Sequence, residues 1–242
     1  MSQVFGALDC VIADFVARYA DPVGKLSRTV ECNEAFMTEL HTDRRIGEVI
    51  EASSTMWVTG AYQLLDAPAF GSLVRANCHA NDLCIYGLVY DIRTGSREPG
   101  GRAMVRGGKR YDGVEFYDEQ IYSEHPDLAA VLQTECSALI VGYERDGRII
   151  HYLPPQPPTV HYSVYECDDA AVRRFTFNCD FFRIVLNTSV APADDLLGTT
   201  IRNAAALHAN RREYELCAGR ELARLMRDNY DRLRTIVGML TA

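Results

Sequence analysis

Short runs of β-branched and aromatic residues, separated by turn-forming residues, fill the middle of the chain and limit what it can fold into. Gly, Pro, Asn and Asp interrupt these runs, which is typical of β-strands joined by tight turns. A set of short strands must close on itself to cover its edges, so the sequence predicts a small closed or nearly closed antiparallel β-barrel. The predicted strands are 46–49, 56–59, 71–75, 84–90, 138–143, 149–153 and 160–165.

Helical patterns flank this barrel on both sides. Apolar residues at spacings of three and four predict an N-terminal helix, and Asn33 is a good cap for a second one. Asp168 is a candidate N-cap, after which the chain is predicted to be helical to its end. The fold class is therefore α+β, with an N-terminal helical cap at 1–45, a β-barrel at 46–165 and a C-terminal helical arm at 166–242.

The last helical segment carries the clearest amphipathic pattern. Its apolar residues follow i, i+3, i+4 spacing and form one stripe, with arginines off it. We expect this stripe to pack either on the barrel or on another subunit. In the second case the C-terminal helix would form a homo-oligomer. The stripe consists of Leu222, Leu225, Met226, Leu233, Ile236, Val237 and Leu240.

Composition favours a reduced, cytoplasmic protein. The apolar runs are far shorter than the about 20 residues that cross a bilayer, and the first residues lack the basic segment of a signal peptide. The eight cysteines of the 242-residue chain form no Cys-x-x-Cys pair, so we expect buried, reduced thiols rather than disulfides or a zinc site. No cofactor is predicted.

One basic segment stands out in an acidic chain. The formal net charge of -8 disfavours nucleic-acid binding, so direct contact with DNA is expected to be weak or absent. Residues 93–110 are predicted to form a Gly/Arg-rich loop inserted in the barrel, without regular structure between 94 and 108. This loop could contact phosphate or an acidic partner, could be solvated, or could dock on the chain's own acidic stretch at 112–170. The candidate contact residues are Arg97, Arg102, Arg106, Lys109 and Arg110.

The sequence contains no complete motif of a nucleotide-binding or hydrolase site. The run Gly107–Arg110 has part of the pattern of a phosphate-binding loop, but Ala103 replaces the first glycine and Arg110 replaces the hydroxyl residue. Neither Gly-x-Ser-x-Gly nor His-Glu-x-x-His occurs. An enzyme is therefore not favoured.

Two histidines offer the alternative of a small-molecule site at the mouth of the barrel. His151 and His161 flank the proline-rich strap at 154–158, where they could face one another and hold a ligand or transfer protons. Tyr152 and Tyr162 would then lie on the opposite sides of their strands. The same alternation of Tyr and His is also expected of a half-buried hairpin in which these side chains have no chemical role.

Three strand segments, Ile46–Ala52, Gly71–Val74 and Ile85–Ile92, together resemble the HAS-barrel family. This small β-barrel is shared by the HerA-like hexameric DNA translocases and the rotary ATP synthases, and the resemblance covers residues 46–165. It implies a non-enzymatic assembly or docking module, because a helical region and not an ATPase core is expected behind the barrel. The implied partner is a HerA-like ATPase or its associated nuclease in DNA processing, such as DNA repair. A small-molecule-binding protein or enzyme that uses the barrel mouth is the alternative.

Overall fold

The computed structural model describes residues 44–79, 83–98, 100–109 and 113–240. The predicted N-terminal helical cap at 1–45 falls almost entirely outside the described residues, and so does Arg110. No helix in the described part of the chain is long and apolar enough to span a lipid bilayer.

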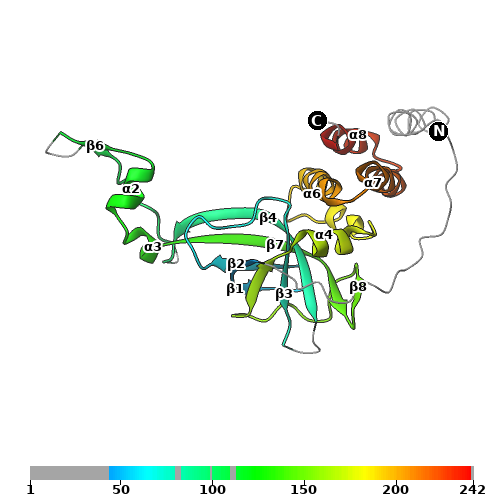
Figure 1. Cartoon of the computed structure of the whole chain (residues 1–242), viewed down its shortest axis with the longest axis horizontal. Coiled ribbons are helices and arrows are strands. Elements are labelled where there is room, and N and C mark those ends of the chain that lie inside the picture. The colour runs from blue at the N-terminus through cyan, green and yellow to red at the C-terminus, as the bar shows by residue number, and fades with distance from the viewer. Residues whose placement is uncertain (1–43, 80–82, 99, 110–112, 241–242) are drawn as a thin grey trace.

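Six antiparallel strands of the described chain close into a barrel (Figure 1). Their order around the barrel is β2-β1-β9-β3-β4-β7, and the pairing of β2 with β7 closes the ring. A further strand, β8 (Arg148–Ile150), pairs with the far end of β7. The predicted α+β fold with a closed antiparallel barrel is confirmed. The barrel strands are β1 (Arg44–Ala52), β2 (Met56–Ala61), β3 (Leu73–Asn77), β4 (Cys84–Ser96), β7 (Leu132–Arg145) and β9 (Ser163–Glu166).

Side chains fill the interior of the barrel. Successive residues of a strand point to opposite faces, and one set, including Val74, Ile85 and Ile140, forms a fully buried cluster. Trp57, the chain's single tryptophan, lies in this cluster, and its Nε1–H donates to Thr59 Oγ1 at 3.1 Å. The barrel therefore has a packed core rather than the lumen of a ligand-binding barrel.

The turn between β7 and β8 follows a local sequence signal. Asp146 and Gly147 have φ angles of 52° and 73°, in the left-handed region that the favoured two-residue hairpin turns require. Glycine adopts this region without steric cost, and aspartate is one of the few other residues that tolerate it. Arg145 pairs with Arg148 across the turn, so the hairpin predicted from Asp-Gly is confirmed.

A layer of helices packs on the outside of the barrel (Figure 1). Asp168 caps the first helix, as predicted, because its Oδ1 accepts a hydrogen bond from the Ala171 N–H at 2.7 Å. Strand residues that point outward, such as Leu88 and Val141, form one buried cluster with Phe175 and other helical residues. The helices are α4 (Asp169–Thr176), α5 (Phe182–Leu186), α6 (Ala193–Leu207), α7 (Arg211–Leu225) and α8 (Tyr230–Leu240).

The apolar stripe near the C-terminus belongs to this same buried cluster. Leu222 and Ile236 are completely buried, and Leu233 is 1% exposed. The stripe extends over two helices, α7 and α8, because the chain turns between them. At the start of α8 the Asn229 side-chain oxygen accepts a hydrogen bond from the Arg232 N–H at 3.4 Å, which favours a new helix start there. The apolar face of the C-terminal region is thus part of the chain's own core.

Strands β4 and β7 continue past the barrel as a two-stranded arm, which projects to the left in Figure 1. Their pairing is regular from Ile92, opposite Cys136, to Ser96, opposite Leu132. Beyond the paired strands lie the residues that we call the arm tip: 97–98, 100–109 and 113–131. The arm tip contains β5 (Gly108–Lys109), β6 (Glu115–Phe116), α2 (Glu119–Glu124) and α3 (Leu128–Val131).

The arm corrects two predictions from the sequence. The pattern predicts irregular structure from residue 94, whereas β4 continues to Ser96. It also predicts a helix over 127–134, whereas β7 already begins at Leu132. Both differences have one cause, because the two segments pair with each other. The hydrogen bonds between these distant segments outweigh local signals such as a glycine within the strand.

Candidate functional site

The arm tip exposes large apolar side chains to solvent. Val105 is 96% exposed and Met104 is 80% exposed. Each Å² of apolar surface removed from water contributes about 25 cal/mol, so covering these side chains would be favourable. Exposed apolar patches with polar residues around them are typical of protein interaction sites. The large apolar residues exposed at the tip are Met104, Val105, Val114, Tyr117, Tyr122 and Val131.

A pocket with a volume of about 520 Å³ adjoins these side chains. Its apolar lining includes Met104, Ile121 and Tyr122 of the tip together with Leu128 and Val131 of α3. Leu128 is 7% exposed, so part of the pocket wall is well packed. The volume lies in the range of ordinary ligand pockets and would accept a bulky side chain of a partner.

Arginines that the sequence singled out lie around this pocket. Arg97, Arg102 and Arg106 all line it. The Arg97 Nε–H donates to the Leu132 carbonyl at 3.1 Å, and the Arg106 guanidinium lies 3.5 Å from the Asp127 carboxylate. The tip therefore already uses two of these arginines, one of them in an ion pair with the acidic stretch of the chain itself. Arg102 is exposed.

Lys109 does not line the pocket. Lys109 is exposed on β5, and Arg110 lies outside the described residues. The structure thus brings three of the five predicted residues together. Glu98 and Asp118 also line the pocket, so its charge is mixed. A mixed charge suits a partner with both apolar and polar groups better than a polyanion, which these acids would repel.

His151 is a core residue rather than an exposed ligand. It is 8% exposed, and its Nε2 lies 3.1 Å from the Phe175 carbonyl oxygen. Its ring packs against the rings of Phe175 and Phe181, with centroid distances of 4.7 Å and 5.4 Å. Burial lowers the pKa of His151, and the hydrogen bond to the Phe175 carbonyl opposes that shift. The neutral imidazole, donating from Nε2, fits this environment.

The other three residues of the predicted histidine site have separate neighbours. The side chain of His161 is 76% exposed, and its Nδ1 lies 3.4 Å from Glu48 Oε1. The Tyr162 hydroxyl lies 2.7 Å from Nδ1 of His79. Tyr152 is 64% exposed, and neither His161 nor Tyr162 lines the pocket of about 400 Å³ that His151 and Tyr152 share. The structure does not place the four predicted residues around one pocket.

Acidification is expected to destabilise the protein in part through His151. Because burial lowers the folded-state pKa, the unfolded chain takes up a proton that the folded chain resists. This loss of stability is absent at pH values above the ordinary histidine pKa of 6.5. It grows as the pH falls from there toward the lower folded-state pKa of His151. Thermal unfolding at about pH 7.5 and about pH 5.5 should therefore show a melting-temperature difference that shrinks in His151→Gln.

Val190→Gln is the control for this measurement, because it introduces glutamine at an exposed position that has no titratable side chain. We expect Val190→Gln to keep the full pH dependence of the wild type. His208, whose pKa is also lowered by burial and by Arg173, maintains part of the dependence in both variants. Equal melting-temperature differences in the wild type and in His151→Gln would contradict the assignment of His151 as a neutral core residue.

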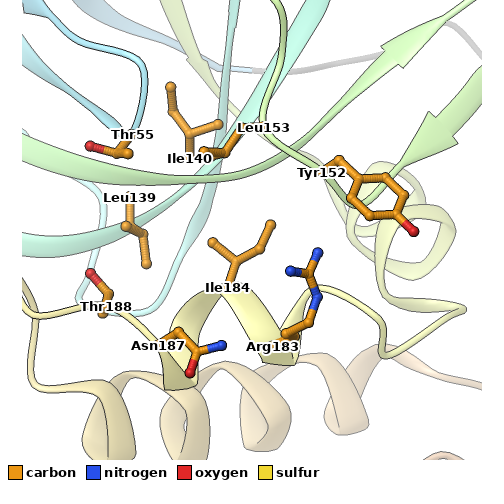
Figure 2. A pocket seen from close by; sticks show the side chains of 9 residues that line it. All are labelled: Thr55, Leu139, Ile140, Tyr152, Leu153, Arg183, Ile184, Asn187 and Thr188. Carbon is orange, nitrogen blue, oxygen red and sulfur yellow. The ribbon is translucent and has the colours of Figure 1, made fainter.

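A second pocket, with a volume of about 430 Å³, lies between the barrel and α5 (Figure 2). Figure 2 shows Leu139 of β7 above α5, from which Arg183 and Ile184 extend. The Arg183 guanidinium lies 5.4 Å from the ring centre of Tyr152. The lining contains no carboxylate, histidine or cysteine, so it can hold an apolar group but has no acid–base pair. Sequence reasoning missed this pocket because its walls are adjacent only in the folded chain.

The arm tip combines exposed apolar side chains, a pocket and arginines on a projecting element. The barrel interior is filled, and the ring of His151 is itself buried against two aromatic rings, so neither is open to a partner. Within the described ranges, no three His, Cys, Asp or Glu side chains are grouped so that they could hold a metal ion. Compared with known proteins, the chain matches no family model and no curated protein sequence.

Proposed function

We propose that this chain is a non-enzymatic docking module that binds a protein partner through its arm tip. The observation that carries the proposal is the pair of side chains Met104 and Val105, exposed at 80% and 96% on an element that projects from the barrel. A projecting tip can enter a partner's surface without a rearrangement of the barrel. The adjoining pocket would accept a side chain of that partner in return.

The barrel and the arm give the tip a defined position. The pairing of β4 with β7 extends from the barrel to the end of the arm, so one sheet connects the packed core to the tip. Side-chain contacts across the arm reinforce the pairing. The hydroxyls of Thr94 and Thr134 lie 2.9 Å apart, and the Arg93 guanidinium lies 2.6 Å from the Glu135 carboxylate. A pre-positioned tip would lose less conformational entropy on binding than an unpaired loop would.

The resemblance to HAS barrels supports a partner in DNA processing, namely a HerA-like ATPase or its associated nuclease. The exposed side chains of the arm tip determine which groups this partner must present. It needs an apolar patch to cover Met104 and Val105, and a carboxylate to pair with the exposed Arg102. The filled barrel interior disfavours the alternative of a small-molecule enzyme at the barrel mouth.

Replacing Val105 by aspartate is expected to weaken partner binding at least about tenfold without affecting the fold. A charge at the centre of an apolar contact would have to be buried unpaired, which typically weakens binding by tenfold or more. The measurement is affinity purification of the tagged wild type and variant from native cells, followed by calorimetry with the purified ATPase and nuclease. Val190→Asp is the matched control, because Val190 is a valine that is 51% exposed outside the arm.

Two outcomes would overturn the proposal. One is equal binding of the purified partner by the wild type and Val105→Asp. The other is binding of a short DNA duplex at low salt that weakens in Arg97→Ala and Arg102→Ala, which would assign the tip to nucleic acid instead. We expect no duplex binding, because the net charge of -8 opposes approach of a polyanion.

A further inference from the structure

Two pockets adjoin one another where α5 lies against the barrel. The first is the pocket of about 430 Å³ between the barrel and α5, which we call the apolar pocket. The second is the pocket of about 400 Å³ that His151 also lines, which we call the polar pocket. Tyr152 and Arg183 line both of them, so the two pockets are neighbours. A ligand at this place can therefore contact an apolar surface and charged side chains at the same time.

The apolar pocket extends from the packed core to the surface. Leu139 is 2% exposed, whereas Leu153 is 45% exposed, and both side chains line the pocket. Ile184 of α5 points into it in Figure 2. An apolar group placed here would remove Leu153 and Ile184 from water, which is favourable. The volume of the pocket lies in the range that accepts a small ligand.

The polar pocket contains two charged side chains without an ion-pair partner. Asp180 and Arg183 both line it and are exposed. In the described part of the chain, neither of them forms an ion pair. The Arg183 guanidinium lies 5.4 Å from the ring centre of Tyr152, which orients the cation and leaves its N–H groups available to a ligand.

The charges of the polar pocket balance one another. The other cation in its lining is Arg224, whose guanidinium lies 2.5 Å from the Glu221 carboxylate. The neutral imidazole of His151 adds no charge. One cation, Arg183, and one carboxylate, Asp180, therefore remain available to a ligand. Such a pair is complementary to a zwitterion, whereas Asp180 would repel a simple anion and Arg183 a simple cation.

We propose that the two pockets together bind a free α-amino acid with a large apolar side chain, such as leucine or phenylalanine. Its α-carboxylate accepts hydrogen bonds from Arg183, and its α-ammonium group donates to Asp180. Its side chain fills the apolar pocket beside Leu153 and Ile184. The site is separate from the proposed docking function, because no residue of the arm tip lines either pocket. Each of the two proposals can therefore fail without the other.

The experiment titrates the full chain with L-leucine or L-phenylalanine and follows binding by NMR. Three analogues of leucine each lack one of its groups: 4-methylpentanoate lacks the ammonium group, 3-methylbutylamine lacks the carboxylate, and glycine lacks the side chain. We expect each analogue to bind at least about tenfold more weakly than leucine, because it leaves a charged group or the apolar pocket without its partner.

Two substitutions test the two charged contacts. Arg183→Met removes the cation and should weaken leucine binding at least about tenfold. Asp180→Asn should also weaken leucine binding, but it should leave the binding of 4-methylpentanoate unchanged or tighter, because that ligand has no ammonium group. A change that only disturbed the fold would weaken both ligands. Arg202→Met and Asp195→Asn, at exposed positions of α6, are the matched controls.

A third substitution tests the apolar pocket. Leu153→Asp places a carboxylate there and should weaken leucine binding at least about tenfold. Leu65→Asp should not, because Leu65 is 59% exposed and lines neither pocket. Circular dichroism checks that each variant is folded. Absence of binding at about 10 mM of either amino acid, or equal leucine binding by the wild type, Arg183→Met and Asp180→Asn, would overturn the proposal.

Discussion

Deletion of the residues after Gly219 is expected to leave the protein unfolded or aggregated. The deleted segment contains Leu222, Met226, Leu233 and Ile236, each at most 5% exposed, and these side chains pack in the core that also holds the outer face of the barrel. Burial of one such side chain contributes about 1.5–3 kcal/mol. Burial of several such side chains together contributes about as much free energy as the whole stability of a typical domain, which is about 5–15 kcal/mol.

Point substitutions on α8 test whether the stripe is part of the core without deleting a segment of the chain. Ile236→Ala should cost about 2–5 kcal/mol of the free energy of unfolding, because it leaves a cavity at a completely buried position. Arg234→Ala, at an exposed position of the same helix, should change it by less than about 0.5 kcal/mol. Denaturant unfolding followed by circular dichroism measures both. A truncated chain that stays monodisperse, with an unchanged melting temperature, would show that the stripe is not a core element.

The sequence predicted the elements whose signals are local. The strand at 84–90, the Asp146-Gly147 turn and the cap at Asp168 each depend on residues within a few positions of one another. Period-two alternation selects the residues that point into the barrel, and helical spacing selects the stripe that covers it. The closed barrel followed from these signals, because many short strands leave too many free edges in an open sheet.

The extent of the arm and the shape of its tip were not predictable in the same way. The sequence identified the basic residues at 93–110, yet the pocket that three of them line is completed by α2 and α3 from beyond residue 118. The burial of His151 likewise depends on Phe175 and Phe181, which reach it from the helical layer. The expectation of buried thiols is likewise wrong for Cys217, which the packing of α7 leaves exposed. Each of these features depends on segments that only the fold brings together.

Gly87→Ala is expected to destabilise the barrel, whereas Gly95→Ala on the same strand is not. A Cβ at position 87 would lie 2.6 Å from Cζ3 of Trp57 and 3.0 Å from Cβ of Ala138, far inside normal contact distances. Trp57 is completely buried, so its ring cannot move aside without displacing the rest of the core. Overpacking of this kind costs about 1–3 kcal/mol.

For a protein of this size, this cost corresponds to a fall of roughly 2–12 °C in melting temperature. Trp57 is the chain's only tryptophan, so its fluorescence reports directly on the barrel core. At position 95 a Cβ would have nothing within 4 Å, and loss of the glycine's backbone freedom in the unfolded chain should leave stability unchanged or slightly raised.

A further substitution tests whether the clash with Trp57 causes the loss of stability in Gly87→Ala. The double variant with Trp57→Phe and Gly87→Ala should be more stable than the sum of the two single effects predicts, because the smaller phenylalanine ring removes the clash. Circular dichroism measures this double-mutant cycle, since the double variant has no tryptophan. Equal effects of alanine at positions 87 and 95 would mean that free space remains beside Trp57. The barrel could then admit a ligand, and the reason for placing the functional surface on the arm tip rather than in the barrel would be lost.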